Sequence, residues 1–253
     1  MLKRVIRLIV AAVLSILILS TVGFLAWALW IPGPGSAALF SLVSDERVVV
    51  TNEPFLVFKP SNSDSTTGVI FYPGARVDPR AYAPIARKIA QKNYLVVVPS
   101  MPLNMALFAP NRAKEIIDAF PAVSSWVIGG HSMGGAFAAQ FAHDNQAKIS
   151  GLFLIGSYPP AGLDLRGSNF KVVSIYGSTD RIATPDEVLS SRPFLPASTE
   201  FVEANGGNHA QFGDYGTQMG DGQPYISADD QHRATATAVI ALLERISAES
   251  RPK

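Results

Sequence analysis

A single serine, Ser132, stands at the centre of the pattern that most constrains the fold of this chain. Residues 130–134 read Gly-His-Ser-Met-Gly; the apolar run 125–129 precedes them, and the small residues 135–141 follow with helical spacing. This order predicts a buried strand, a sharp turn and a helix, a geometry that pushes the hydroxyl of Ser132 out of the fold and into a cleft. A hydroxyl held in this way can act as a nucleophile when a base takes its proton.

Apolar runs that are typical of buried strands alternate with helical patterns along residues 47–246. The predicted strands span residues 47–51, 55–58, 68–72, 94–98, 125–129, 151–155, 171–176 and 199–203, and the predicted helices span residues 82–91, 112–120, 135–141 and 228–246. Because strands that alternate with helices pair in parallel, we expect an α/β fold: one mostly parallel sheet with helices on both faces. The first two strands, which are joined by a short turn, are expected to form an antiparallel edge.

The composition excludes several kinds of protein and site. The 253 residues suffice for one large domain, and the formal net charge of +1 argues against nucleic acid as the main partner. No cysteine is present, which excludes disulfides, a thiolate nucleophile and cysteine-bound metals. The stretch Asp-Gly-Gln at residues 221–223 lacks the spaced acidic ligands of a calcium site. We therefore expect no metal and no cofactor.

An uncharged, strongly apolar run covers residues 8–31 near the N-terminus. At about 1.5 Å of rise per residue, a helix of this length crosses a hydrocarbon core of roughly 30 Å. Lys3, Arg4 and Arg7 flank only the N-terminal side of the run, so residues 1–7 are expected to stay in the cytoplasm. The run thus predicts a transmembrane signal anchor that crosses the cell membrane once.

The residues beyond the predicted anchor divide into a tether and a globular part. The sequence Pro-Gly-Pro-Gly-Ser at residues 32–36 ends the apolar helix. We expect a linker over residues 32–46 and a globular domain over residues 47–253, outside the cytoplasm. A cleaved signal peptide that releases a secreted domain is the alternative, because Ala-Trp-Ala at residues 26–28 resembles a cleavage site. The apolar run exceeds the roughly 7–15 residues usual in such peptides, which favours the anchor.

Four histidines could serve as the base that takes the proton of Ser132. His209 lies in a glycine-rich loop directly after the last predicted strand. Because all parallel strands present their C-terminal ends at one edge of the sheet, the loops that carry His209 and Ser132 are expected to meet there. His131 is committed to the turn itself, and His143 and His232 are expected on solvated helix faces. His209 is therefore the predicted base.

An acid that orients the imidazole is expected in a similar loop. Asp180 follows the strand predicted at residues 171–176 and is our candidate. Asp164, in the preceding loop, is the main alternative. Asp186 is better explained as a residue of a first helical turn, where a carboxylate complements the helix dipole. Asp214 is too close in sequence to the predicted base.

The chain order Ser132, Asp180, His209 is the order found in α/β-hydrolases, and residues 47–246 resemble that superfamily. The resemblance is greatest to its small dienelactone-hydrolase-like and esterase-like members. It implies a catalytic triad of these three residues on a mostly parallel sheet of about eight strands. Dienelactone hydrolases proper use a cysteine nucleophile, so Ser132 departs from their pattern and their substrate is not carried over.

Two backbone N–H groups are needed to stabilise the negative charge that develops on a substrate oxygen. The first is expected from Met133, directly after the nucleophile. The second is expected from the loop after the strand at residues 68–72, where many relatives have His-Gly and this chain has Pro73-Gly74. Proline has no N–H to donate. We therefore predict Ala75 as the donor, with Gly74 and Arg76 as neighbouring alternatives.

The substrate cleft is expected to be fairly open. Few residues separate the strands predicted at 151–155 and 171–176, so the domain is expected to have little or no cap. Apolar side chains after two of the strands are candidates for the substrate pocket: Met101, Met105, Phe108 and Tyr158. The alternative for the methionine-rich loop is packing onto the sheet edge, and the sequence leaves both open.

These features predict a catalytic domain that hydrolyses small-molecule carboxylic esters through an acyl-enzyme on Ser132. The same three residues would also serve a lactone, thioester, amide or carbon–carbon hydrolase, because the fold does not choose the bond. A non-catalytic, membrane-anchored binding module is the remaining alternative. The natural substrate and the oligomeric state are not specified by the sequence.

Overall fold

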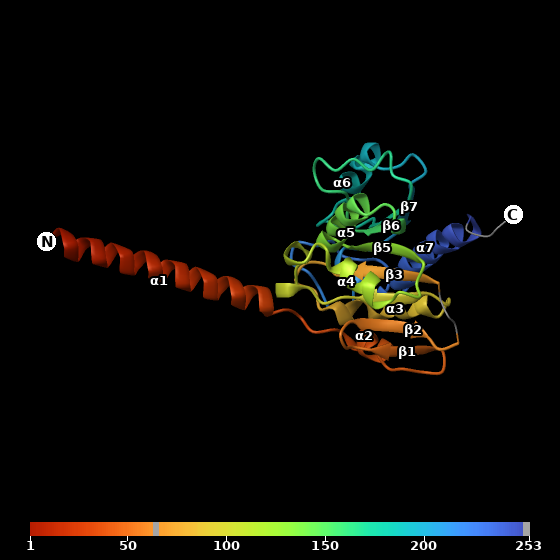
Figure 1. Ribbon diagram of the computed structural model, residues 1–253, viewed down its shortest axis with the longest axis horizontal. Helices are drawn as coiled ribbons and strands as arrows, with labels where there is room; N and C mark the ends of the chain where they lie inside the picture. The colour runs from red at the N-terminus through yellow and green to blue at the C-terminus, as the bar shows by residue number, and fades with distance from the viewer. Residues whose placement is uncertain (63–65, 250–253) are drawn as a thin grey trace. The chain divides into compact units, whose positions relative to one another are not determined.

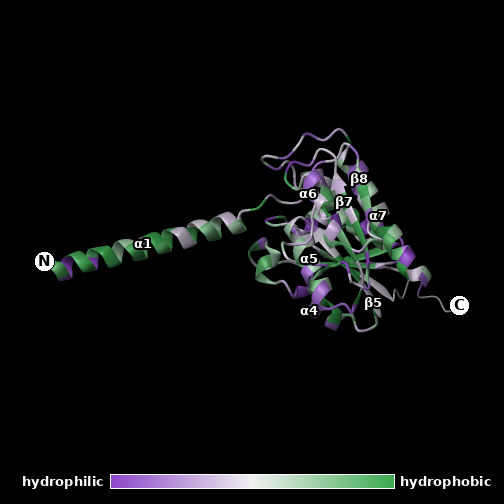
Figure 2. Cartoon of the chain, turned by 90° about the horizontal axis from the view of Figure 1, so that it is seen from above, coloured by the Kyte–Doolittle hydropathy of each residue, from purple (hydrophilic) through white to green (hydrophobic). Residues whose placement is uncertain are grey.

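A computed structural model describes residues 1–62 and 66–249 of the chain. The chain forms two units, Met1–Ile31 and Pro32–Lys253, and each is described by itself. The first unit is the helix α1 (Leu2–Leu29), which by length and composition could cross a membrane. Figure 2 shows mostly hydrophobic colouring along α1, with hydrophilic residues near its N-terminal end. The helix starts earlier than the predicted span 8–31, and it ends two residues sooner. The residue before a proline disfavours helical geometry, which agrees with an end just ahead of Pro32.

The second unit is built on an eight-stranded sheet with the order β1-β2-β4-β3-β5-β6-β7-β8. β1 pairs with β2 and β2 with β4 in antiparallel fashion, whereas all the other pairs are parallel. The predicted mostly parallel sheet with an antiparallel edge is thus confirmed. The strands are β1 (Val48–Thr51), β2 (Leu56–Pro60), β3 (Thr67–Tyr72), β4 (Leu95–Val98), β5 (Ser125–His131), β6 (Ile149–Ile155), β7 (Lys171–Gly177) and β8 (Glu200–Ala204).

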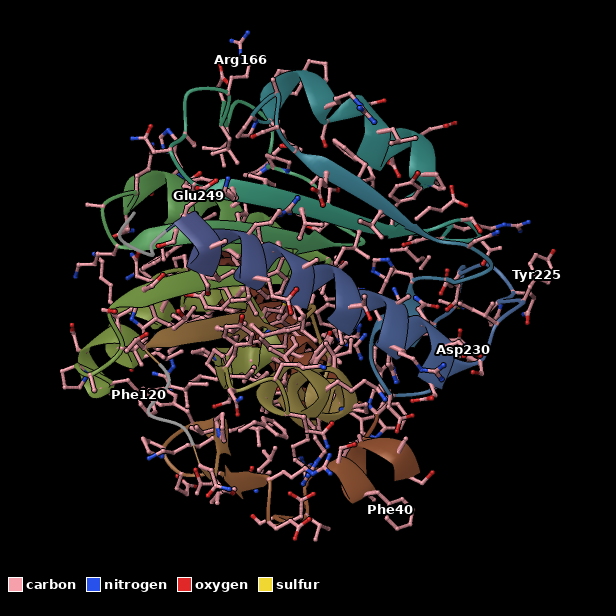
Figure 3. All side chains as sticks on the ribbon, turned by 90° about the vertical axis from the view of Figure 1, so that its right-hand side faces the viewer. Phe40, Phe120, Arg166, Tyr225, Asp230 and Glu249 are labelled. Carbon is pink, nitrogen blue, oxygen red and sulfur yellow. The ribbon has the colours of Figure 1, made fainter. Side chains whose placement is uncertain are left out.

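Helices cover both faces of the sheet (Figure 1). The α-helices of this unit are α2 (Ser36–Ser41), α3 (Ala83–Ala90), α4 (Arg112–Ala119), α5 (Met133–Asp144), α6 (Pro185–Ser190) and α7 (Ala228–Glu249). Short 3-10 turns are η1 (Pro79–Tyr82), η2 (Pro102–Asn104), η3 (Ala106–Phe108), η4 (Arg192–Phe194) and η5 (Ala210–Phe212). Figure 3 shows α7 running across one face of the sheet, from near Asp230 to Glu249.

Two apolar clusters hold these layers together, because side chains alternate between the faces of a strand. On β3, Val69 and Phe71 join the cluster under α3 and α7, while Ile70 and Tyr72 join the cluster under α4 and α5. Both faces of the central strands are therefore buried, which explains their continuous apolar sequence. The helices leave the C-terminal edge of the parallel strands to the loops.

The strand order places a topological switch point beside β3. The chain runs from β3 outward to β4, and then returns to the other side of β3 to build β5, β6, β7 and β8. Ligands of open α/β sheets bind at such a point, outside the carboxyl ends of the strands. The loops after β3 and β5, which hold Ala75 and Ser132, flank this point.

The segment 32–46, which the sequence predicts as a linker, packs against the domain and belongs to its compact unit. Ala38 of α2 is fully buried, and its N–H donates to Oδ2 of Asp214 at 2.7 Å. The guanidinium of Arg87 donates to the carbonyl oxygen of Ser41 at 2.9 Å and to Oδ2 of Asp45 at 2.8 Å. The sequence pattern does not reveal this packing, because six helical residues are too few to show an apolar stripe.

Candidate active site

Ser132 occupies the single residue between β5 and α5, with φ of 53° and ψ of −126°. A positive φ is unfavourable for a residue with a Cβ, so the surrounding backbone must hold it in place. The glycines on either side of Ser132 allow the turn to pack closely against the backbone that follows β3. A Cβ on Gly130 would collide with the carbonyl oxygen of Tyr72, and a Cβ on Gly134 with those of Tyr72 and Pro73. The predicted strand-turn-helix is confirmed, and its glycines are there for close packing.

The backbone of Ser132 is tied down while its side chain is left available. Its N–H donates to the carbonyl oxygen of Ile155 at 2.9 Å, and its own carbonyl accepts the hydroxyl of Ser157 at 2.7 Å. Within residues 1–62 and 66–249, the hydroxyl of Ser132 has no hydrogen-bond partner. A cavity of about 270 Å³ lies against it, lined also by Met133, Ala136, Gly156, Ser157, Tyr158, Ile182 and Ala183. Ser132 can therefore meet a small molecule.

His209 and Asp180 form a buried pair at the same edge of the sheet. Nδ1 of His209 lies 2.7 Å from Oδ2 of Asp180, and the two side chains are 1% and 0% exposed. The other carboxylate oxygen accepts the N–H groups of Ile182 at 2.8 Å and Ala183 at 2.9 Å. A carboxylate accepts hydrogen bonds, so Nδ1 carries a proton, and in the neutral imidazole Nε2 is then left as an acceptor. This is the tautomer that a general base requires.

Gly156 connects this pair with the cavity of Ser132. It has φ of 48°, and a Cβ placed on it would lie 3.1 Å from Nδ1 of His209 and 3.2 Å from Oδ2 of Asp180. Gly156 also lines the cavity beside Ser132. The pair therefore lies directly behind this part of the cavity wall, where a Cβ would crowd both side chains and the positive φ favours glycine. The structure brings all three predicted residues to the same edge of the sheet.

The alternative acids and bases of the sequence have other roles. Asp164 is exposed and paired with Arg166, and Asp186 lies in the first turn of α6 as expected. His143 is half-exposed at the end of α5. The expectation of a solvated face for His232 is wrong: its side chain is buried, because the start of α7 packs against η5. Burial lowers the pKa of His232 below its ordinary value.

Two polar residues that the sequence did not single out as part of the site hold the loop of His209. The carboxylate of Asp221 accepts the N–H groups of His209 at 3.2 Å and Ala210 at 2.8 Å. The buried side chain of Gln231 accepts the N–H of Asn208 at 3.1 Å and donates to its carbonyl at 2.6 Å. The carboxylate of Asp221 is thus occupied by backbone donors.

The predicted oxyanion donors can be compared with their neighbours. The N–H of Gly74 donates to the hydroxyl of Tyr82 at 2.9 Å, and the N–H of Arg76 donates to the carbonyl oxygen of Asn104 at 2.7 Å. The N–H of Ala75 has no acceptor in the described part of the chain. Of these three N–H groups, it alone is free to bind a ligand. The N–H of Met133, at the start of α5, is likewise unpaired among the described residues. Both groups are therefore available to a ligand.

The loop of Ala75 is held by a buried side-chain pair. Because the hydroxyl of Tyr82 accepts from Gly74, its own proton is free to go to Nδ1 of His131, 2.9 Å away. The ring of His131 in turn lies 4.4 Å, centroid to centroid, from that of His209. Burial, and secondarily the neighbouring His209, lowers the pKa of His131 well below its ordinary value. His131 is thus a neutral link between the oxyanion loop and the predicted base.

The candidates for the substrate pocket lie in different places. Tyr158 lines the cavity of Ser132 and is partly exposed. Met101 and Met105 are buried, and Met101 packs in the apolar cluster under α4 and α5. Phe108 is half-exposed on η3. None of these last three lines the cavity, and their contact with a substrate stays a prediction.

The fold and this arrangement define the class of protein. A serine on a strand-turn-helix, with a histidine and an acid after later strands of a mostly parallel sheet, is the pattern of α/β-hydrolases. Residues 68–233 match the alpha/beta hydrolase family, and the chain belongs to that family. A comparison with curated proteins finds no significant match.

Several solved structures share the fold. Est1E from Butyrivibrio proteoclasticus, with bound ferulic acid, superposes with a TM-score of 0.59 at 11% identity, over 79% of this chain and 98% of that one. An esterase domain from a Rhodothermus marinus protein superposes with a TM-score of 0.58 at 12% identity, over 78% of this chain and 96% of that one. A thermophilic esterase from Thermogutta terrifontis, with bound malate, superposes with a TM-score of 0.57 at 12% identity, over 81% of this chain and 99% of that one. At such low identity the likeness concerns the fold.

Proposed function

We propose that this hydrolase cleaves carboxylic esters, with Ser132 as nucleophile, His209 as general base and Asp180 as the acid that orients it. The observation that carries the proposal is the buried 2.7 Å contact between His209 and Asp180. It lies behind the wall of the cavity into which the strained Ser132 faces. The esterase structures with the same fold support this choice of bond.

In the acylation step, Oγ of Ser132 attacks the ester carbonyl and its proton passes to Nε2 of His209. Asp180 stays ionised and stabilises the imidazolium that forms. The N–H groups of Met133 and Ala75 donate to the oxygen that becomes negative, aided by the positive end of the α5 dipole. His209 then returns the proton to the leaving alcohol. In the second half, water attacks the acyl carbonyl while His209 takes its proton. The bond from the carbonyl carbon to Oγ of Ser132 then breaks, His209 returns the proton to that oxygen, and the acid leaves.

The full-length protein in detergent provides the test. Wild type is expected to hydrolyse p-nitrophenyl acetate, and Ser132→Ala is expected to lose on the order of 10⁶-fold in kcat, down to background. Ser41→Ala, which removes a hydroxyl from α2 and leaves the cavity intact, serves as the control. Hydrolysis by Ser132→Ala at the rate of wild type would overturn the proposal.

Two other readings of the site have their own tests. A lactone, thioester, amide or carbon–carbon hydrolase would use the same residues, and a substrate panel with matched leaving groups separates these bonds. A non-catalytic binding module would leave Ser132 unreactive. Covalent labelling by a fluorophosphonate, which requires an activated serine, is expected for wild type and lost in Ser132→Ala. Folded protein that is not labelled would favour the binding module.

We further infer that α1 (Leu2–Leu29) anchors the protein in the cell membrane, with residues 1–7 in the cytoplasm and the hydrolase domain on the other side. The apolar length of α1 and the three N-terminal cations, Lys3, Arg4 and Arg7, support this topology. A C-terminal reporter that is active only in the cytoplasm is expected to be silent. Mass spectrometry of the purified N-terminus distinguishes the anchor from a cleaved signal peptide.

A further inference from the structure

A second hollow adjoins the cavity beside Ser132, and both lie between the same two segments of chain. The cavity itself lies between residues 156–158, after β6, and residues 182–183, after β7. The second, outer hollow of about 330 Å³ lies between the continuations of these two segments, residues 158–163 on one side and residues 187–194 on the other. Tyr158 lines both hollows, so the outer hollow adjoins the cavity of the nucleophile at this side chain.

Three polar side chains that line the outer hollow already make hydrogen bonds within the protein. The hydroxyl of Ser190 donates to the carbonyl of its own helix four residues earlier at 2.6 Å, and that of Ser191 does so three residues earlier at 2.6 Å. Oε2 of Glu187 accepts both the N–H and the hydroxyl of Thr184 at 2.8 Å in a capping box. These side chains leave no hydrogen-bond donor for a ligand. A ligand rich in hydrogen-bonding groups would therefore lose its hydration there for few hydrogen bonds in return.

The remaining surface of the outer hollow is apolar. Pro159 and Pro160 carry no N–H, and Leu163 closes their turn by donating its N–H to the carbonyl of Pro160 at 3.0 Å. The opposite side is formed by Phe194, which is 51% exposed although it is a large apolar side chain. Burial, and secondarily the nearby Glu187, raises the pKa of Tyr158, so its hydroxyl stays neutral. The nearby Glu187 also disfavours anions.

We propose that this outer hollow binds the uncharged, apolar chain of the substrate, so that esters with an extended hydrocarbon group are preferred over acetates. The inference rests on the proposed ester hydrolysis at Ser132 and names the class of ester that the site takes. Each methylene that leaves water on entering the hollow is expected to raise kcat/KM by up to about fourfold. The rise ends when the chain projects beyond Phe194.

Two ester series measure the preference with full-length protein in lipid nanodiscs. p-Nitrophenyl esters from acetate to octanoate lengthen the acyl part, and alkyl acetates from ethyl to octyl lengthen the alcohol part. A rise in kcat/KM along either series supports the proposal and says which part of the ester occupies the hollow. Flat kcat/KM along both series would overturn it. Because acetate hydrolysis and its loss in Ser132→Ala test the ester hydrolysis itself, the two failures are distinguishable.

Three matched Phe→Ser variants show where the hydrocarbon chain of the substrate binds. Phe194→Ser is expected to lower the ratio of long-chain to acetate turnover about tenfold. Phe40→Ser removes an exposed ring from α2, far along the sequence from the residues of both hollows, and is expected to leave the ratio as in wild type. Phe108→Ser tests the methionine-rich loop, where the ring is 46% exposed. A ratio that falls in Phe108→Ser and not in Phe194→Ser would overturn the proposal.

Discussion

The hydroxyl of Tyr82 lies 2.9 Å from Nδ1 of His131, and both side chains are fully or almost fully buried. The same hydroxyl accepts the N–H of Gly74, one residue before the predicted oxyanion donor. Burial raises the pKa of Tyr82 well above its ordinary value, so the hydroxyl keeps its proton and can donate it to His131. A single phenol thereby connects the oxyanion loop with the turn that carries Ser132.

Tyr82→Phe removes this connection without emptying the core. The N–H of Gly74 and Nδ1 of His131 are then left unpaired, which permits the oxyanion loop to shift. We expect kcat for p-nitrophenyl acetate to fall about 10- to 100-fold while KM changes little, because misplaced donors affect the transition state more than the bound ester. Tyr215→Phe, which removes a hydroxyl bonded to Gln218, is the control. An unchanged kcat in Tyr82→Phe would show that the pair plays no positioning role.

The oxyanion donor itself can be removed by a backbone change. Ala75 is the second residue of a turn in which Val77 donates to Gly74 at 3.3 Å and Arg76 has φ of 58°. Proline is favoured at the second position of such a type II turn, so Ala75→Pro is expected to fold. Loss of the N–H is expected to lower kcat about 10²- to 10³-fold.

The control for this change is Arg76→Gly, which keeps every N–H and suits a positive φ. Circular dichroism and thermal unfolding establish that both variants fold. If folded Ala75→Pro turns over esters at the rate of Arg76→Gly, the second donor must be another group.

Asp221 is expected to act as a positioning residue for the predicted base. In Asp221→Asn one carboxylate oxygen is replaced by an amide NH2 group, which cannot accept the N–H of Ala210. We expect kcat to fall about 10- to 100-fold through displacement of His209. Asp230→Asn, on the exposed side of α7, is the control and should leave kcat unchanged. Full activity of Asp221→Asn would argue that other contacts suffice to hold the loop.

The buried histidines predict acid sensitivity. The folded protein holds the pKa of His131 and His232 below the ordinary value of 6.5, while the unfolded chain titrates there. Below pH 6.5 these two histidines therefore bind more protons in the unfolded state than in the folded state. The free energy of unfolding must fall as the pH drops through this range, by up to about 1.4 kcal/mol per pH unit for each histidine.

His232→Gln isolates one of these two contributions. Urea unfolding at pH 7.5, 6.5, 5.5 and 5.0 is expected to show a shallower decline of stability below pH 6.5 in this variant than in wild type. The slope is the readout, because the substitution also changes stability at every pH. His143→Gln, at an exposed histidine, should retain the slope of wild type. Equal slopes in His232→Gln and wild type would contradict the assignment.

Much of the fold can be predicted from local sequence. The alternation of apolar runs and helical patterns predicted the parallel sheet, since side chains repeat every two residues in strands and about every 3.6 in helices. The strand and helix around Ser132 follow from the same local pattern. The places of Asp180 and His209, each after its own later strand, follow from the shared direction of parallel strands.

Other features of the site depend on contacts between distant parts of the chain. Asp221 reaches back 12 residues to the N–H of His209, and Gln231 reaches 23 residues to Asn208. Their polar side chains look solvated in sequence, and so does that of His232. The packing of α2 and the outer hollow beyond Tyr158 are likewise absent from any local pattern.

The sequence by itself thus determined the elements of the hydrolase fold and the three residues that we propose as its triad. Only the tertiary structure decided which polar groups are buried to hold those residues, which N–H groups remain free and which hollow adjoins the cavity. The physical reason is that periodicity reports the face that a segment buries, whereas hydrogen bonds across the fold depend on which loops the sheet brings together.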